Sequence, residues 1–334
     1  MKKNIISLVK LPDIIISELY LRLFQEKNSL IIFTLHGLFY SKKESNQNLV
    51  YPQTWITKDQ FHQFVEYYLK HNYTFVSPND ILHGLDNDKK YIMITFDDGY
   101  YNNNLALPIL KKYQIPALFF ISTNHIKKNK CFWWDILYRE RIKSGISKKE
   151  IVHENRQLKS KTPEEIEKYL IEKFGEEAFK PKSDIDRPFT PSELRDLSKE
   201  KNIFLGNHTS DHAILTNYSS NDIRSQINDA QEFIYNITGI TPIAISYPNG
   251  NYSDKIIKIS KETGIKLGIT TEPRKNKLPI GYQINNCMNL GRFDLSGSDN
   301  IINQCKLFRS DLLLYTYFQN FLSKRQINQR NIFY

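Results

Sequence analysis

Two adjacent carboxylates give the first indication of chemistry in this sequence. Asp97 and Asp98 directly follow the apolar run 91–96, and Gly99 comes next. Burying two carboxylates at the end of a strand is unfavourable unless their charge is used. Neighbouring side chains point in different directions, so one carboxylate could bind a cation while the other faces a substrate. Taken alone, this segment is explained equally well by a plain Asp-Asp-Gly turn.

A second cluster contains two histidines, His208 and His212, four residues apart. If this segment is helical, both imidazoles face the same side. Together with a carboxylate from elsewhere, they would form a site of two histidines and one carboxylate that leaves room for water and substrate. The pair by itself also fits two surface histidines after a strand.

A third cluster, Tyr247-Pro248-Asn249-Gly250, predicts a rigid turn. Such a turn exposes a backbone N–H that could stabilise an oxyanion. Without the other two clusters it would be interpreted as a turn and nothing more.

The elements around these clusters alternate between short apolar strands and helical patterns, which predicts an α/β fold with a parallel sheet or barrel. All three clusters follow predicted strands. Because active sites of parallel α/β folds lie at that end of the sheet, we expect the clusters to meet there. The predicted strands cover residues 30–35, 73–76, 91–96, 117–121, 203–205, 243–246 and 266–270, and the predicted helices cover 57–70, 105–113, 219–239 and 253–264.

Residues from about 124 to 187 interrupt the alternation, are rich in Lys and Glu, and predict a helical insertion in a domain spanning 30–310. The aromatic residues 132–134 are expected to anchor this insertion to the core, or to stack on a sugar ring. Segment 1–29 is predicted to be amphipathic, packing on its own domain or lying on a membrane. Residues 311–334 are predicted to form a C-terminal helix and a basic tail.

The three clusters together resemble the NodB-homology polysaccharide deacetylases, carbohydrate esterase family 4. TFDDGY at 95–100 is similar to the first motif of that family, HTSDH at 208–212 to the second, and SYPNG at 246–250 to the third. The resemblance covers roughly residues 30–125 and 188–295. It implies a distorted (β/α)7-8 barrel of the NodB-homology type, here with a helical insertion.

The resemblance also implies roles for individual residues. A divalent metal, most often zinc and in some members nickel or cobalt, would be held by Asp98, His208 and His212. Asp97 would be the general base, and the backbone N–H of Asn249 would stabilise the oxyanion. The remaining motif residues are expected to bind the sugar, namely Tyr100, Tyr247 and Pro248.

Two departures from the family pattern concern the base and the general acid. The third motif lacks the arginine that often orients the catalytic aspartate, and Arg292 resembles a later family arginine that could supply the charge. No histidine follows His212, so the usual C-terminal L-x-H motif is absent. A circularly permuted subset of the family takes this histidine from an early strand, and His36 resembles it.

These residues predict a metal-dependent deacetylase that hydrolyses the N-acetyl group of an amino sugar in a polysaccharide or glycan precursor. Two alternatives stay open: a catalytically inactive glycan-binding module and a two-histidine, one-carboxylate iron oxygenase. An oxygenase would usually show an H-x-[DE] pair, which is absent around His208. An aspartate-nucleophile phosphatase would need a D-x-D pair, which Asp97 and Asp98 do not form.

Composition limits the location and the partners. The 46 Lys and Arg outnumber the 36 Asp and Glu, but scattered solvated lysines explain this excess without a nucleic-acid partner. Peripheral association with an anionic membrane remains open. The three widely spaced cysteines give no disulfide framework and fit a reducing compartment. With no signal cleavage site recognised, we expect a cytoplasmic protein, with the surface of the inner membrane as the alternative.

Overall fold

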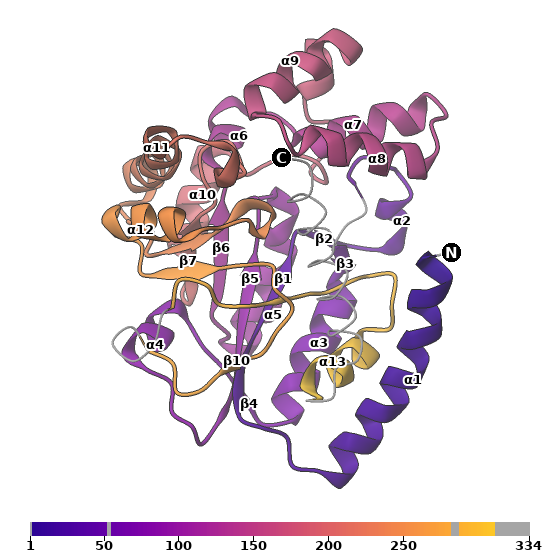
Figure 1. The fold of residues 1–334 in the computed structure, drawn as a ribbon, viewed down its shortest axis with the longest axis vertical. Helices are drawn as coiled ribbons and strands as arrows, with labels where there is room; N and C mark the ends of the chain where they lie inside the picture. The colour runs from indigo at the N-terminus through magenta and orange to yellow at the C-terminus, as the bar shows by residue number, and fades with distance from the viewer. Residues whose placement is uncertain (1, 52–54, 282–286, 311–334) are drawn as a thin grey trace.

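The computed structural model describes residues 2–51, 55–281 and 287–310, with side chains described from Asp13 onward. The predicted segment 311–334 lies outside these residues. At the centre is a curled nine-stranded sheet in the order β10-β1-β5-β6-β7-β8-β9, with β4 beside β5 and β11 beside β1 (Figure 1). The strands are β1 (Ser29–Leu35), β4 (Tyr73–Phe75), β5 (Lys90–Phe96), β6 (Ala117–Ile121), β7 (Ile203–Asn207), β8 (Ala244–Ser246), β9 (Leu267–Ile269), β10 (Asn276–Lys277) and β11 (Phe293–Asp294).

All the named pairings of this sheet are parallel except that of β1 with β10. Alternate residues of β1 point into two different cores: Ile31, Phe33 and Leu35 into one, Leu30 and Ile32 into the other. Burial on both faces explains why the strands are continuously apolar rather than alternating. The predicted α/β fold with a parallel sheet is thus confirmed.

The strand register brings the polar clusters together. Leu35 of β1 pairs with Phe96 of β5, so His36 and Asp97 both follow at the same edge of the sheet. Asn207 of β7 pairs with Ile121 of β6 and Ile245 of β8, so His208 emerges beside Ser246. Parallel strands put all these residues at the carboxyl edge, where the sequence analysis expected them.

The segment 287–294 connects the two ends of the curled sheet. At one end, the backbone N–H of Gly268 in β9 donates to the carbonyl of Cys287 at 2.8 Å. The N–H of Thr270, just after β9, donates to the carbonyl of Leu290 at 2.9 Å. At the other end, β11 pairs with Phe33 and Thr34 of β1. This segment completes the curl into a distorted barrel and carries Arg292 to the carboxyl edge of the sheet, beside Asp97.

Helices cover the outside of the sheet: α3 (Lys58–Lys70), α5 (Leu107–Tyr113), α10 (Pro191–Ser198), α11 (Ser220–Thr238), α12 (Asp254–Glu262) and α13 (Ile301–Arg309), with α4 (Pro78–His83) near the opposite end of the strands. The strand and helix patterns predicted from the sequence match these elements closely. No pattern predicted α10, α13, β10, β11, the short helix α2 (Lys42–Ser45), or the small two-stranded sheet of β2 (Gly37–Phe39) and β3 (Trp55–Thr57).

The stretch between β6 and α10 is helical, as its composition suggested. It contains α6 (Thr123–Lys128), α7 (Trp133–Lys143), α8 (Lys148–Leu158) and α9 (Pro163–Phe174). Helices α7 to α9 share a small core of their own that includes Leu137, Leu158 and Leu170. In Figure 1 these helices lie above the carboxyl ends of the strands, so the insertion stands over the edge where the polar clusters meet.

Candidate active site

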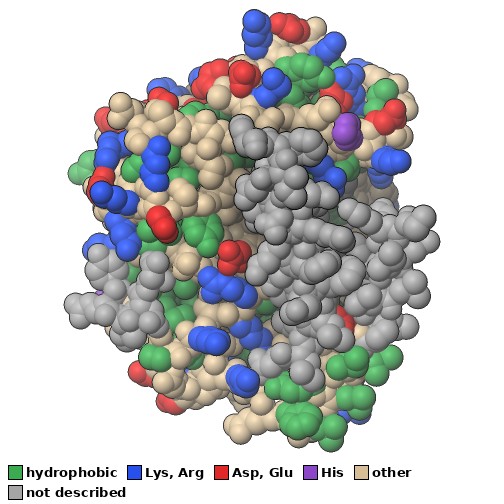
Figure 2. Space-filling view, viewed as in Figure 1, with side chains coloured by type: hydrophobic (Ala, Val, Ile, Leu, Met, Phe, Trp, Pro, Cys, Tyr) green, Lys and Arg blue, Asp and Glu red, His purple; other side chains and the backbone are tan. Residues whose placement is uncertain are grey.

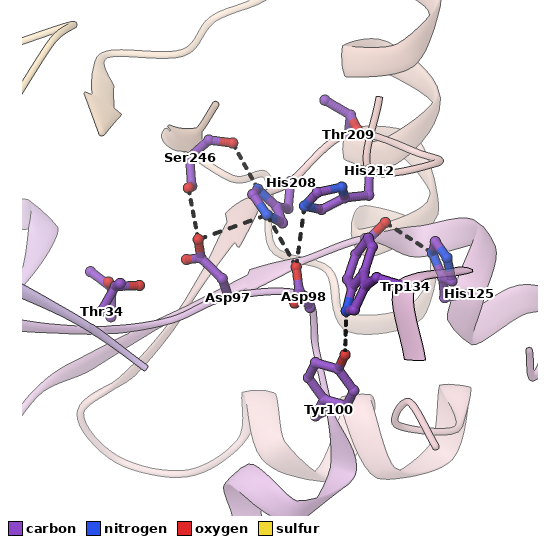
Figure 3. A network of polar contacts seen from close by, with 12 residues as sticks. Thr34, Asp97, Asp98, Tyr100, His125, Trp134, His208, Thr209, His212 and Ser246 are labelled. Carbon is purple, nitrogen blue, oxygen red and sulfur yellow. Dashed lines mark hydrogen bonds and ion pairs between the residues drawn. The ribbon is translucent and has the colours of Figure 1, made fainter. Parts of the chain in front are cut away.

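Three side chains from two distant segments converge above the sheet (Figure 3). The Nε2 atoms of His208 and His212 lie 3.3 and 3.4 Å from the same oxygen, Oδ1 of Asp98. One potential ligand atom from each of these three residues lies within 4.8 Å of the other two. The structure therefore brings together the three residues expected to hold a metal.

The surroundings of these side chains fit a divalent cation. Both carboxylate oxygens of Asp98 are buried without a hydrogen-bond partner, which is unfavourable unless a cation balances their charge. Nδ1 of His208 lies 2.8 Å from the carbonyl oxygen of Ser246. A carbonyl only accepts, so Nδ1 must carry the proton when the ring is neutral, and the lone pair of Nε2 then faces Asp98. One carboxylate and two imidazoles are ligands that zinc and related ions accept.

Charges in this cluster also shift the histidine pKa values. Burial lowers the pKa of His212 to about 3, which favours the neutral ring that metal ligation needs. Burial acts the same way on His208, but the charges of Asp97 and Asp98 outweigh it and raise the pKa of His208. A proton on His208 therefore competes with a cation for Nε2.

The two histidines do not converge through a helix. Residues 208–212 form an irregular turn in which Thr209 and His212 adopt left-handed backbone angles, with φ of 63° and 53°. Asp98 and Asn249 are also left-handed, with φ of 73° and 59°. Such angles are uncommon for residues other than glycine and gather at functional sites. The helical geometry considered for this pair is thus wrong, although both rings still reach the same carboxylate.

Asp97 lies beside the triad and is held by Arg292. The guanidinium donates from Nη1 to Oδ1 at 2.8 Å and from Nη2 to Oδ2 at 2.6 Å, and the Ser246 hydroxyl donates to Oδ2 at 3.1 Å. Burial alone would raise the pKa of Asp97, but the Arg292 charge, assisted by His208, holds it well below its usual range. Asp97 is therefore kept ionised and in one orientation.

A cavity of about 250 Å³ opens above these groups. His36, Asn249 and Asp294 line it together with the triad and Asp97. The expected general acid and oxyanion-binding residue thus face the same space as the expected base. Part of the wall comes from the insertion, including Trp133 and Lys159, and Lys159 Nζ donates to the side chain of Asn249 at 2.7 Å.

The three residues expected to bind the sugar are not brought to this main cavity. Tyr100 is buried, and its hydroxyl donates to Oδ2 of Asp135 at 2.6 Å. Tyr247 is fully buried and donates to the carbonyl of Met288 at 3.0 Å, and Pro248 is buried next to it. Tyr247 and Pro248 pack beneath the turn, whereas Tyr100 lines a smaller pocket beside His36 and Asp98, so its contact with the sugar stays a prediction.

Trp134 and Asp135 support the site in a way that no sequence pattern indicated. The Trp134 ring packs edge-on against His212, with centroids 4.6 Å apart, and its Nε1 donates to the Tyr100 hydroxyl at 3.0 Å (Figure 3). Asp135 in turn accepts from Tyr100 and from the backbone N–H of Tyr51. The aromatic run 132–134 was the available signal, and its anchoring role was weighed, but no pattern pointed to His212 as the partner.

Comparisons with known proteins agree with this geometry. A family model described as Polysaccharide deacetylase matches residues 84–268. The protein YxkH of Bacillus subtilis (strain 168), provisionally named a polysaccharide deacetylase, is 23% identical over 241 residues, which is 71% of this chain and 64% of YxkH. The chain thus spans less than two thirds of that relative.

Two solved structures share the fold over most of the chain. The Streptococcus pyogenes deacetylase PplD, in complex with acetate, is 19% identical with a TM-score of 0.55, covering 84% of this chain and 98% of PplD. IcaB from Ammonifex degensii is 16% identical with a TM-score of 0.55, covering 85% of this chain and 99% of IcaB. At these identities the likeness supports the fold, and the site rests on the residues of this chain.

Proposed function

The chain belongs to the polysaccharide deacetylase family, and on that premise we propose that it hydrolyses the N-acetyl group of an amino sugar in a glycan or glycan precursor. The observation that carries this proposal is the position of Asp97, fixed by Arg292 and directly beside the Asp98–His208–His212 cluster. A base next to a cation site is the arrangement that metal-assisted amide hydrolysis requires.

The residues of the cavity divide the chemistry among them. Asp98, His208 and His212 would hold a divalent cation, whose Lewis acidity would polarise an amide carbonyl and lower the pKa of water. Asp97 accepts a proton from the attacking water as its oxygen bonds to the carbonyl carbon. The backbone N–H of Asn249 donates to the resulting oxyanion.

Collapse of that oxyanion breaks the carbon–nitrogen bond. His36, on the cavity wall, donates a proton to the departing nitrogen, so that acetate and a free amine leave. Each of the two proton-transfer groups is expected to contribute roughly 10²–10⁴-fold to the rate. The same ligand set could hold iron in an oxygenase, but that chemistry would leave the Arg292–Asp97 pair and His36 without a use.

Acetate release from a panel of N-acetylated glycans, with and without a chelator, tests the proposal. Asp97→Asn should retain the metal and lose acetate release by roughly 10²–10⁴-fold, because the amide cannot accept the water proton. His208→Ala should lose both metal and activity. Asp211→Asn is the matched control. Asp211 lies in the same HTSDH segment, but its carboxylate accepts hydrogen bonds from Asn124 and Gln226 and does not contact the triad.

Near-normal turnover of the Asp97→Asn protein would refute the assigned base. Glycan binding without acetate release from any member of the panel would instead favour an inactive binding module. Oxygen consumption by the iron-loaded protein would favour the oxygenase.

A further inference from the structure

The N-terminal helix α1 (Lys2–Leu23) turns apolar side chains toward solvent. Ile15, Leu19 and Leu23 follow one another at helical spacing and are 53%, 50% and 72% exposed. Phe24, just after the helix, is 61% exposed. Figure 2 shows a group of hydrophobic side chains at the lower right, where Figure 1 places the C-terminal end of α1. We call these four residues the α1 stripe.

The face of α1 that packs on the protein carries both polar and apolar residues, since Tyr20 and Leu21 are half-buried beside Ser17. Asp13 and Ser17 are buried, at 1% and 0% exposure, where the helix lies against α13. Lys306 of α13 forms an ion pair with Glu18 of α1 at 3.3 Å. A helix that serves only to cover its own domain carries its apolar face inward. Because α1 carries apolar residues outward as well as inward, the α1 stripe indicates a partner outside the chain.

The size of the α1 stripe argues against a second copy of the chain as that partner. A stable protein interface buries about 800 Å² on each side, and four side chains along one narrow helix offer well below that area. A lipid surface needs less, because an amphipathic helix binds by placing its apolar face only about 5–10 Å deep at the headgroup boundary. Within the described residues, no helix is long and apolar enough to cross a membrane.

Charge favours an anionic surface over a neutral one. Arg22 lies between Leu19 and Leu23 in sequence and is 71% exposed, but it is paired with Glu18 at 2.9 Å, so the excess positive charge comes from other residues. The sequence of α1 also contains Lys2, Lys3 and Lys10, and the whole chain has a formal net charge of +10. Each basic residue next to an interfacial helix strengthens its attraction to an anionic leaflet.

We propose that the α1 stripe attaches this protein to the surface of an anionic membrane, with Ile15, Leu19 and Leu23 inserted at the lipid interface. The helix then lies in the plane of the membrane, and the barrel stays on the aqueous side. This attachment is independent of the deacetylase chemistry, since none of its residues lines the cavity of the candidate active site.

Flotation of the full-length protein with lipid vesicles tests the proposal. Vesicles of phosphatidylcholine with about 30% phosphatidylglycerol supply the anionic surface, and pure phosphatidylcholine the neutral one. The variant Ile15→Ser, Leu19→Ser, Leu23→Ser removes the apolar contacts at exposed positions. Ile171→Ser with Tyr235→Ser, at positions 36% and 54% exposed away from α1, is the matched control.

The wild type and the control should float with the anionic vesicles, and the stripe variant should bind at least about tenfold more weakly. Circular dichroism should show all three proteins folded. The proposal is overturned if the wild type does not bind anionic vesicles, if it binds neutral vesicles equally well, or if the stripe variant binds like the wild type. A concentration-dependent dimer that the stripe variant abolishes would identify a second copy as the partner and also overturn it.

Discussion

Arg292 donates hydrogen bonds to both carboxylate oxygens of Asp97, at 2.8 and 2.6 Å, although 195 residues separate the two in the sequence. Both side chains are buried, at 3% and 1% exposure. The pair exists only because the segment 287–294 connects β9 to β1 and carries Arg292 over the end of β5. The proposed base therefore depends on the closure of the barrel as much as on its own motif.

Arg292→Lys should lower kcat by roughly 10–100-fold, because lysine keeps the charge but cannot donate to both oxygens in a planar fork. The metal content should stay unchanged, since Arg292 donates its hydrogen bonds to Thr34, Thr95 and Asp97 and not to the three ligands. Kinetics of acetate release together with metal analysis measures both quantities. Loss of metal in this variant would show that Arg292 supports the triad rather than Asp97.

Removal of the metal should destabilise the protein as well as inactivate it. Without a cation, the buried Asp98 carboxylate has no hydrogen-bond partner for either oxygen. A metal present at about 100 times its Kd adds roughly 2.7 kcal/mol of stability, so Tm should fall with chelator and recover with zinc. His153→Ala, at a histidine of α8 outside the triad, should respond like the wild type. An identical Tm with and without chelator would contradict a structural role for the ion.

Trp134→Ala should weaken metal binding about 10-fold or more, since the ring that packs against His212 and limits its orientation is removed. Trp134→Phe keeps an aromatic wall but loses the bond to Tyr100, and should fall between alanine and wild type. Chelator competition measures the metal Kd separately from activity. If both variants bind the metal with wild-type affinity, Trp134 is only part of the packing of the insertion.

Asp135→Asn should remove a pH dependence of stability. Burial raises the pKa of Asp135 from 3.8 to about 8. Between these values the folded chain keeps a proton that the unfolded chain has lost, so the contribution of Asp135 to the free energy of unfolding falls as pH rises. From about pH 5 to about pH 8, the wild type should lose roughly 1–3 kcal/mol relative to Asp135→Asn.

Urea unfolding at the two pH values measures this difference. Asp229→Asn, an exposed aspartate of α11, should follow the wild type at both. A constant gap between wild type and Asp135→Asn at the two pH values would show that Asp135 is ionised in the folded chain across the whole range.

The sequence by itself determined the fold class and the triad. Apolar runs that end in Asp97-Asp98, in His208 and in Tyr247-Pro248 predict parallel strands, and the carboxyl ends of parallel strands lie at one edge. The resemblance to the deacetylase family, which the family match confirms, rests on those same short runs. Residues close in sequence to a strand end follow that strand, so a local pattern was sufficient to place them.

Only the tertiary structure decided which faces and distant partners these residues have. Left-handed turns at Thr209 and His212, rather than a helix, direct both rings to Asp98. Tyr100 turns inward to Asp135, Trp134 reaches His212, and α1 packs on α13 with Asp13 and Ser17 buried and Ile15 and Leu19 exposed. Each of these outcomes depends on how segments far apart in the chain pack against each other. A periodic pattern gives the faces of an element, but the partner that covers each face is set by the completed fold.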